Sequence, residues 1–376
     1  MRKTALKAAL VATLLALVLW CNGRNRQQKT VMAAASGAPA ACVPPSEVGP
    51  SPEQTAWQLF VASTCPVNSD KYPYVVWENW IEQNQLYGSA SAKALTEGGR
   101  PRFHMSPLAE FLRQKAKGGN VRPEAVLPLV ASQDCNSQTW SKRTICEEAR
   151  LNPSAQLYIA SNGLTTLDGQ VQFISAGKTF QFTPPSVELK ADWIQLPNCT
   201  NLPTGVHVEQ IANVCYALGG IHLISKLIDK WIWATFEPQN TSTNPQRCVV
   251  LGCSDPWGSV PARSSGASTQ LSQALSQLMT GANLADEWKN YRLDGVQVDF
   301  VDGAGKATRL GNSIIEGDNA GTPALMKKSS CITCHDLSTI NKSKQSESPN
   351  FIIGPPKKVP AGYVRRDFVW SLSLAQ

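Results

Sequence analysis

The eleven cysteines of this 376-residue chain constrain its fold more than any other feature. Two of them belong to a C-x-x-C-H segment at residues 331–335, and Cys21 follows an apolar N-terminal run. The other eight form an even set, which is typical of a disulfide framework in an oxidising compartment. Pairing neighbours along the chain is the natural arrangement, although eight cysteines allow many connectivities. The neighbouring pairs are Cys42 with Cys65, Cys135 with Cys146, Cys199 with Cys215, and Cys248 with Cys253.

The N-terminus has the features of an export signal. Arg2, Lys3 and Lys7 precede an apolar run at residues 8–20, which is shorter than the roughly 20 residues of a transmembrane helix. Small residues suited to cleavage follow at residues 33–36. Further cations directly after the apolar run leave an uncleaved anchor in the inner membrane as the alternative. We therefore expect a periplasmic or exported protein whose residues 1–33 are a signal or an N-terminal anchor.

The positive charge of the chain is concentrated in this N-terminal segment. The formal net charge is +7, but residues 1–33 hold six cations and no acid, so the remainder carries +1. A nearly neutral protein offers no basic surface to a phosphate backbone. We therefore expect no nucleic-acid partner.

Hydropathy patterns predict an α+β fold in which helices bracket a central antiparallel β-rich region. Apolar residues at helical spacing predict helices at residues 54–64, 107–117, 269–279 and 282–291. Alternating or compact apolar runs predict strands at residues 156–161, 170–175, 186–190, 221–227, 231–236 and 296–301. The first two of these strands are expected to form a hairpin. Together the patterns favour a disulfide-stabilised α+β architecture over a repeat protein or a helical bundle.

The C-x-x-C-H segment has the residue types that attach haem covalently. Two thiols at this spacing reach the two vinyl groups of the porphyrin, and the adjacent imidazole reaches the iron. We therefore expect Cys331 and Cys334 to carry one haem c, and His335 to be an axial iron ligand. The alternatives are a zinc half-site, a redox dithiol and a chance match. Zinc would need a second ligand pair of similar spacing, which Cys248 and Cys253 match poorly.

The motif does not determine the second axial ligand of the iron. Residues 336–376 contain neither methionine nor histidine, so a distal ligand from this chain must precede the motif. We favour His222, because the two glycines before Ile221 permit close approach of another group. His104, with the adjacent Met105, is the runner-up, and an open iron site is the remaining alternative. The other candidate residues are His207, Met279 and Met326.

Two tryptophans are candidates for packing against the haem. Trp231 and Trp233 alternate with Ile232, so both indole rings are expected on one face of a strand. Packing in the core is the more common role of aromatic strand residues, and it is the alternative here. The sequence contains no motif of a serine hydrolase, a zinc protease or a nucleotide-binding loop. The catalytic residues are therefore unknown at this stage.

Several segments resemble a group of uncharacterised bacterial cytochrome c family proteins with a single C-terminal C-x-x-C-H. The specific matches are S-C-I-T-C-H at residues 330–335 and W-I-W-A-T-F-E at residues 231–237. In that group a histidine usually follows the glutamate, whereas Pro238 stands here. The histidine of the group's Gly-x-His is retained as His222. The resemblance implies export and covalent haem, and it implies no defined reaction. Weaker matches lie at residues 55–62, 76–80, 188–193, 220–225 and 312–316.

Two haem-based functions agree with these expectations. The first is electron transfer by an exported monohaem cytochrome, which needs a redox partner protein and no catalytic residues. The second is a haem-dependent oxidoreductase with an open distal site for peroxide or a small molecule, and the length of the chain favours it. A third function, without haem, is that of a disulfide-stabilised binding or redox protein. We expect a linker at residues 34–52, an α+β domain at residues 53–310, and a haem-attachment segment packed on it at residues 311–376.

Overall fold

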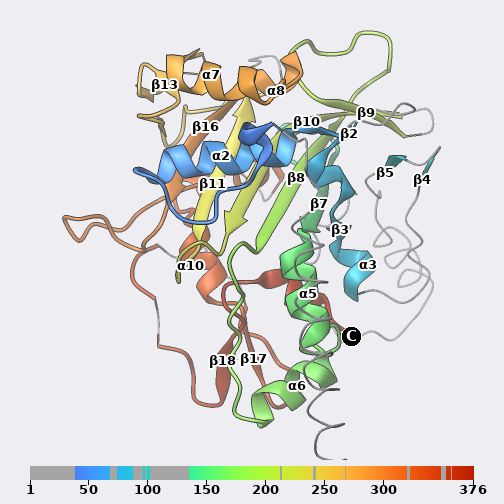
Figure 1. The fold of residues 1–376 in the computed structure, drawn as a ribbon, viewed down its shortest axis with the longest axis vertical. Coiled ribbons are helices and arrows are strands. Elements are labelled where there is room, and N and C mark those ends of the chain that lie inside the picture. The colour runs from blue at the N-terminus through green and yellow to red at the C-terminus, as the bar shows by residue number, and fades with distance from the viewer. Residues whose placement is uncertain are drawn as a thin grey trace, which may run out of the picture.

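The computed structural model places an antiparallel sheet between helices, so the fold is α+β (Figure 1). It describes residues 39–67, 74–87, 96–97, 100–101, 135–211, 214–239, 243–266, 268–319, 322–348, 353–356 and 358–376. The expected N-terminal signal, the expected helix at residues 107–117, and His104 with Met105 lie outside these ranges. Within these ranges, no helix combines the length and the apolar character that a membrane span requires.

The central sheet is an antiparallel meander, with eight strands in the described part of the chain. Its five long strands lie side by side in chain order: β7 (Ile145–Leu151), β8 (Val187–Gln195), β10 (Val214–Ser225), β11 (Ile232–Pro238) and β16 (Tyr291–Gln297). Three short strands extend it: β3 (Ile81–Glu82) and β6 (Cys135–Asn136) beside β7, and β9 (Val208–Ile211) beside β10. Neighbours in the chain are therefore neighbours in the sheet, as antiparallel pairing permits.

Helices and short two-stranded ribbons surround the sheet. The helical segments are η1 (Ala40–Cys42), α2 (Pro52–Thr64), η2 (Val76–Asn79), α3 (Gln83–Tyr87), α5 (Pro153–Ser161), α6 (Leu167–Ser175), α7 (Gln273–Gly281), α8 (Asp286–Lys289), η5 (Ser313–Asn319), α9 (Pro323–Met326), α10 (Cys331–Asp336) and η6 (Trp370–Leu374). The ribbons pair β1 (Pro66–Val67) with β2 (Tyr74–Val75), β4 (Thr96–Glu97) with β5 (Arg100–Pro101), β12 (Cys253–Ser254) with β14 (Arg263–Ser264), β13 (Ser259–Val260) with β15 (Gln270–Leu271), and β17 (Thr339–Asn341) with β18 (Tyr363–Arg365).

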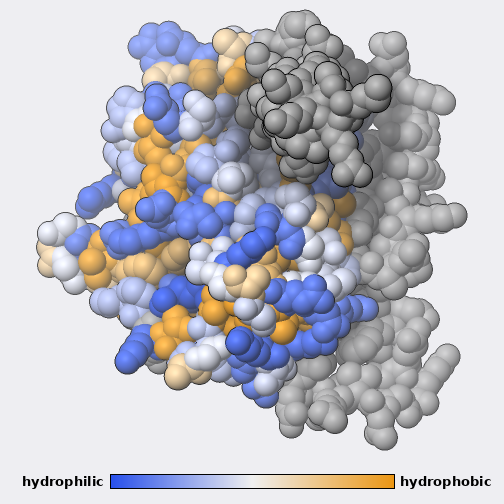
Figure 2. Space-filling view, turned by 60° about the horizontal axis from the view of Figure 1, so that its bottom comes forward, coloured by the Kyte–Doolittle hydropathy of each residue, from blue (hydrophilic) through white to orange (hydrophobic). Residues whose placement is uncertain are grey.

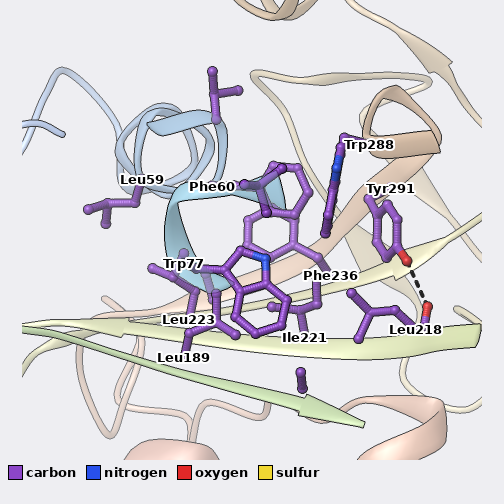
Figure 3. Close-up of a cluster of buried hydrophobic side chains, with 14 of the residues drawn as sticks. Leu59, Phe60, Trp77, Leu189, Leu218, Ile221, Leu223, Phe236, Trp288 and Tyr291 are labelled. Carbon is purple, nitrogen blue, oxygen red and sulfur yellow. Dashed lines mark hydrogen bonds between the residues drawn. The ribbon is translucent and has the colours of Figure 1, made fainter. Parts of the chain in front are cut away.

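Helix α2 covers one face of the sheet and forms an apolar core with it (Figure 3). Ser51 caps the helix by accepting a hydrogen bond from the backbone N of Gln54 at 3.1 Å, and a proline occupies the first turn. Phe60 of α2 packs against Phe236 of β11 with ring centroids 4.5 Å apart. The sheet contributes Leu189, Leu218, Ile221 and Leu223 to the same cluster.

The opposite face of the sheet is divided into two apolar ends and a charged middle. The larger apolar end combines Trp231 and Trp233 with side chains from α5, α6, α10 and the C-terminus. The smaller end is a cluster of three isoleucines, Ile145, Ile194 and Ile314. Between these ends lie the buried charged residues Glu147 and Asp192, with the half-buried Lys190. Because side chains alternate along a strand, the same strands supply the apolar core on the other face.

The lower end of the molecule in Figure 1 carries α6 and the ribbon of β17 with β18. Figure 2 turns this end toward the viewer. Hydrophobic and hydrophilic residues are interspersed over the coloured surface. Such mixing is usual for a protein surface, because polar side chains are too few to cover it completely.

Three of the six strands expected from the sequence are confirmed. Strands β8, β10 and β11 occupy the predicted ranges 186–190, 221–227 and 231–236, and α2 and α7 occupy two of the predicted helical ranges. The strand expected at residues 296–301 overlaps only the end of β16. The helix expected at residues 282–291 is reduced to α8.

The expected hairpin at residues 156–161 and 170–175 is wrong, because these residues form α5 and α6. Asn152 caps α5 by accepting a hydrogen bond from the backbone N of Ala155 at 3.0 Å, with a proline in the first turn. Thr166 caps α6 in the same way, by accepting from Gly169 N at 3.0 Å. The capping residues thus indicate these two helices better than the short apolar runs do, because such runs fit a helix and a strand equally well.

The disulfides follow the sequential pairing. The bonds join Cys42 with Cys65, Cys135 with Cys146, Cys199 with Cys215, and Cys248 with Cys253. Cys331 and Cys334 are the free cysteines of the described residues. The bonded cysteines thus form a framework of their own, and the C-x-x-C-H pair is left for other chemistry.

We expect removal of the Cys42–Cys65 bond to destabilise the protein more than removal of the Cys248–Cys253 bond. The bonds close loops with sequence separations of 23 and 5 residues, respectively. Loop-closure entropy predicts losses of about 3.4 and about 2.1 kcal/mol in the free energy of unfolding. The double variants Cys42→Ser/Cys65→Ser and Cys248→Ser/Cys253→Ser should be compared by urea denaturation. Equal losses would contradict the entropic account.

Candidate haem site

The C-x-x-C-H segment forms the short helix α10, which docks on the edge strand β16 through Gln297. The side-chain oxygen of Gln297 accepts a hydrogen bond from the backbone N of Ile332 at 3.3 Å, and its Nε2 donates to Ser330 Oγ at 3.0 Å. Both Gln297 and Ile332 are buried. One buried amide therefore fixes the start of the helix, while Cys331 and Cys334 remain half-buried.

The two free thiols lie in surroundings that suppress the thiolate form. Burial raises the pKa of Cys334 to about 12 and the pKa of Cys331 well above its usual value, and the nearby charge of Glu316 raises both further. Zinc ligands and reactive dithiols need the thiolate. A thioether carries no charge, so these surroundings suit covalent haem better than a metal site or redox dithiol.

His335 is held in the tautomer that suits metal ligation. Its Nδ1 lies 2.8 Å from the backbone carbonyl oxygen of Phe368. Because a carbonyl oxygen only accepts, Nδ1 donates the hydrogen and Nε2 keeps its lone pair. Burial lowers the pKa of the imidazole to about 3, so the ring is neutral at neutral pH. The residue expected to bind iron thus has one nitrogen fixed and the other available.

A strained turn near the C-terminus aims the Phe368 carbonyl at His335. Asp367 and Phe368 both have left-handed backbone conformations, with φ of 52° and 68°, which are unfavourable for side chains of this size. The Asp367 carboxylate accepts hydrogen bonds from Lys226 Nζ and from Phe182 N, each at 2.7 Å. These bonds hold the turn in place. No sequence pattern indicates this partner, because the group that binds His335 is a backbone carbonyl.

Trp233 is the tryptophan that reaches the motif. Its ring packs edge-on against the His335 imidazole with centroids 4.6 Å apart, and its indole N donates to the carbonyl of Lys230 at 2.8 Å. Trp231 belongs to the same apolar cluster, but it packs against Phe182, at a centroid distance of 5.6 Å. The two rings therefore share a face of the sheet, and Trp233 alone of the two contacts His335 in the described interactions.

His222 of β10 lies beside the motif and is bound by Glu316. Its Nε2 is 2.8 Å from Glu316 Oε1, and single ligand atoms of His222, Glu316 and Cys331 lie within 4.8 Å of one another. Burial opposes ionisation of Glu316, but His222 and Lys190 together hold the pKa of its carboxyl below the usual value. An ionised carboxylate makes Nε2 a donor, so only a neutral ring would carry a lone pair on Nδ1. Nδ1 is buried, and it has no hydrogen-bond partner within the described residues.

Glu316 belongs to the π-helix η5, which Asn312 anchors to the sheet. Glu316 Oε2 accepts a hydrogen bond from the backbone N of Asn312 at 2.6 Å. Asn312 donates in turn to Thr235 Oγ1 at 2.9 Å. A Cβ at Gly220 would lie 2.6 Å from Asn312 Oδ1, so only glycine fits there. The close approach expected at this glycine is therefore made by Asn312.

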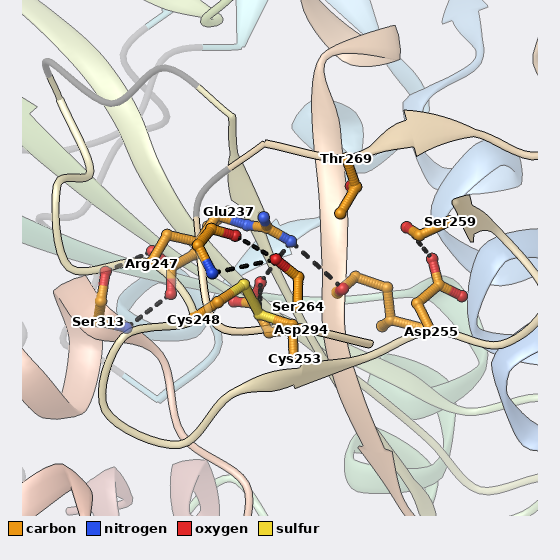
Figure 4. The surroundings of a disulfide bond; sticks show 12 residues. Glu237, Arg247, Cys248, Cys253, Asp255, Ser259, Ser264, Thr269, Asp294 and Ser313 are labelled. Atoms are coloured by element: carbon orange, nitrogen blue, oxygen red, sulfur yellow. Dashed lines mark hydrogen bonds and ion pairs between the residues drawn. A yellow bond between two sulfur atoms is a disulfide. The ribbon is translucent and has the colours of Figure 1, made fainter. Parts of the chain in front are cut away.

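A second anchor joins η5 to the Cys248–Cys253 disulfide through buried acids (Figure 4). Ser313 donates to the Glu237 carboxylate from both its backbone N and its hydroxyl. Glu237 interacts with Asp294, whose pKa is raised well above its usual value, chiefly by burial. Asp294 also pairs with Arg247 at 2.9 Å. Because π-helical turns are rare and often functional, this double anchoring supports a role for η5 in positioning Glu316.

Strand β8 brings two further charged residues next to His222. Lys190 is the pairing partner of His222 across β8 and β10, and its Nζ lies 2.7 Å from Glu147 Oε2. Asp192 is completely buried, and its Oδ2 accepts a hydrogen bond from Asn319 Nδ2 at 2.9 Å. Sequence reasoning missed these residues. The signal was present, because charged and apolar residues alternate over residues 187–193.

Of the other candidates for the distal iron ligand, some lie away from the C-x-x-C-H motif and some lie outside the described residues. The His207 ring stacks on Trp288 in the core on the α2 side of the sheet, with centroids 4.5 Å apart, and Met279 belongs to the same core. His207 and Met279 are therefore excluded as distal iron ligands, because the sheet separates them from α10. Met326 packs against the π-helix, with its Sδ 3.7 Å from where a Cβ at Gly317 would lie. His104 and Met105 lie outside the described residues.

Comparisons with known proteins give no assignment. No protein-family profile, curated protein or solved structure matches the chain. The resemblance to cytochrome c family proteins therefore stays a prediction, and function must be inferred from the geometry around α10.

Glu188, on the charged face of β8, is expected to make the stability of the protein depend on pH. Burial is the main cause that raises the pKa of Glu188 to about 7 from an ordinary value of 4.5. Between these values the folded state holds a proton that the unfolded state releases, so the free energy of unfolding falls as pH rises through this window. The shift is equivalent to about 3 kcal/mol. In Glu188→Gln this part of the decline should vanish, as measured by urea denaturation at a series of pH values. A decline of equal size in both proteins would contradict the assignment.

Proposed function

We propose that this chain is an exported c-type cytochrome that carries one haem on Cys331 and Cys334 and transfers electrons. The observation that carries the proposal is the geometry of α10. Two free thiols lie one helical turn apart, while the other described cysteines are bonded in pairs. The neighbouring His335 has its Nδ1 fixed by the Phe368 carbonyl at 2.8 Å and its Nε2 available. This is the set of donors that haem c requires.

Each residue around α10 has a definite part in this proposal. When bound, haem c supplies reversible one-electron chemistry at its iron. Cys331 and Cys334 would hold the porphyrin, and His335 would provide a nitrogen ligand. The Phe368 carbonyl keeps this imidazole in one tautomer, and the Trp233 ring excludes water from one of its sides. The protein thus sets the iron's surroundings mainly through fixed, buried groups.

His222 would supply a second nitrogen ligand to the haem in this proposal. It lies on the same face of the sheet as the motif, and it has a buried ring nitrogen without a described partner. Glu316 acts as a positioning residue, because it holds the other nitrogen of the ring at 2.8 Å. Two neutral imidazoles are a suitable ligand set for an iron that changes charge without exchanging ligands.

A haem-dependent oxidoreductase is the second candidate, and a specific observation favours it. Lys190, Asp192 and Glu316 form a cluster of ionisable groups beside His222. Such groups can supply or accept protons during reactions of peroxide or another small molecule. Simple electron transfer does not require them. This candidate becomes the better one if His222 leaves the iron open.

The proposed cytochrome implies a redox partner protein and an oxidising location. Disulfides are typical of periplasmic and exported proteins. The basic and apolar N-terminal residues, which lie outside the described part of the chain, supply the proposed export signal or membrane anchor.

Covalent attachment is tested by expression in a bacterial periplasm together with cytochrome c maturation proteins. The purified protein should show a Soret band, retain peroxidase staining on a denaturing gel, and exceed its polypeptide mass by one haem. Cys331→Ser/Cys334→Ser should lose all three signals and keep its disulfides, because the bonded cysteines lie elsewhere in the chain. A colourless wild-type protein that is folded would refute the proposal.

Axial ligation is tested by the matched variants His222→Gln and His207→Gln. His222→Gln should convert ferric low-spin haem to a high-spin form that binds cyanide and, after reduction, carbon monoxide, whereas His207→Gln should keep the wild-type spectrum. His207 is the control because it lies in the core on the other side of the sheet. Glu316→Gln should shift the ligand field without loss of haem. A wild-type protein that is already high-spin would favour the oxidoreductase instead.

A further inference from the structure

Asp192 is a buried carboxyl group that the proposed haem site leaves unexplained. Its side chain is completely buried in the middle of the sheet. Oδ2 is bound by Asn319, whereas Oδ1 has no hydrogen-bond partner within the described residues. A buried carboxylate oxygen without a donor is costly, because its lost hydration is not replaced. Proteins keep such groups where their protonation is used.

Charged groups from three elements surround Asp192. Glu147 of β7 is its cross-strand partner, and Lys190 is two residues before it on β8. Glu316 and the Asn319 amide face it from the π-helix. Burial raises the pKa of Asp192 well above its usual value, Glu147 and Glu316 raise it further, and Lys190 and Asn319 oppose the rise. The burial and the two neighbouring acids therefore favour the protonated form of the carboxyl group.

The same charges lie beside His222, the second proposed iron ligand. Lys190 is its cross-strand partner, and Glu316 Oε1 lies 2.8 Å from its Nε2. A change of charge at an iron bound there must therefore also act on the cluster around Asp192. The coupling is strong in this region because the groups are shielded from water.

We propose that Asp192 takes up one proton when the haem gains one electron, so that reduction of this protein is coupled to proton uptake. This inference rests on the proposed function, because it needs haem on Cys331 and Cys334. One electron from a one-electron donor reduces ferric to ferrous iron. One proton from water binds the Asp192 carboxylate, so the net charge of the region is unchanged. Oxidation reverses both steps.

A cavity of about 220 Å³ beside the π-helix is lined by Ser141, Arg143 and Asp318, among others. Asp318 pairs with Arg143 at 2.7 Å and directly precedes Asn319, the residue that holds Asp192. The π-helix that holds Asp192 thus also lines this cavity.

The test is the reduction potential of the haem-loaded protein as a function of pH, measured by spectroelectrochemistry. If one proton accompanies one electron, the potential falls by about 59 mV for each pH unit. Wild type should approach this slope over part of the neutral range, and Asp192→Asn should lose most of it. Asp299→Asn is the matched control, because the Asp299 side chain is 44% exposed and pairs with Lys230. A slope that persists in Asp192→Asn would assign the proton to another group, such as a haem propionate, and would overturn the inference.

Infrared difference spectra provide a second readout that does not depend on the potential. Reduction of wild type should produce the carbonyl stretch of a protonated carboxylic acid, and Asp192→Asn should lack this band. Wild type without the band would overturn the inference even if the variant fails to fold. Failure of the proposed function is recognised separately, because the protein would then have no Soret band.

Discussion

The burial of charge on one face of the central sheet is the constraint on which the rest of the structure depends. A charged side chain removed from water costs several kcal/mol unless a partner replaces the lost hydration. Lys190 pairs with Glu147, His222 with Glu316, and Asp192 with the Asn319 amide. Two of these partners come from η5, a segment that is remote in the sequence. The C-terminal part of the chain is therefore needed to complete the sheet, and it brings the C-x-x-C-H helix to that face.

Features with local signals could be predicted from the sequence. The disulfides join successive cysteines, and β10 and β11 are compact apolar runs. Helices α5 and α6 were mistaken for strands because each is nine residues long and has few buried apolar residues. At this length the helical and strand periods are hard to distinguish. The caps Asn152 and Thr166 identify the helices, but their hydrogen bonds are visible only in the structure.

The residues of the candidate site also divide into those with a sequence signal and those without one. The proposed attachment residues Cys331, Cys334 and His335 belong to one short motif, so this proposal could be made from the sequence. Their supporting groups lack such a signature. The partner of His335 is the backbone carbonyl of Phe368, and Glu316 lies 94 residues after His222. Only the packing of η5 on β10 brings that pair together. The alternating charges of β8 were visible in the sequence, but their function depends on what covers them.

The order of the cysteines has a consequence for biosynthesis. Each bridge joins successive cysteines, with separations of 5 to 23 residues, and all of them precede α10. In a chain translocated from its N-terminus, a thiol oxidase acting on cysteines as they emerge would therefore form the native bridges without reshuffling. Cys331 and Cys334 would emerge last, after the other described cysteines had found their partners. The timing of translocation would thus protect this pair from mispairing until the ligation enzymes reach it.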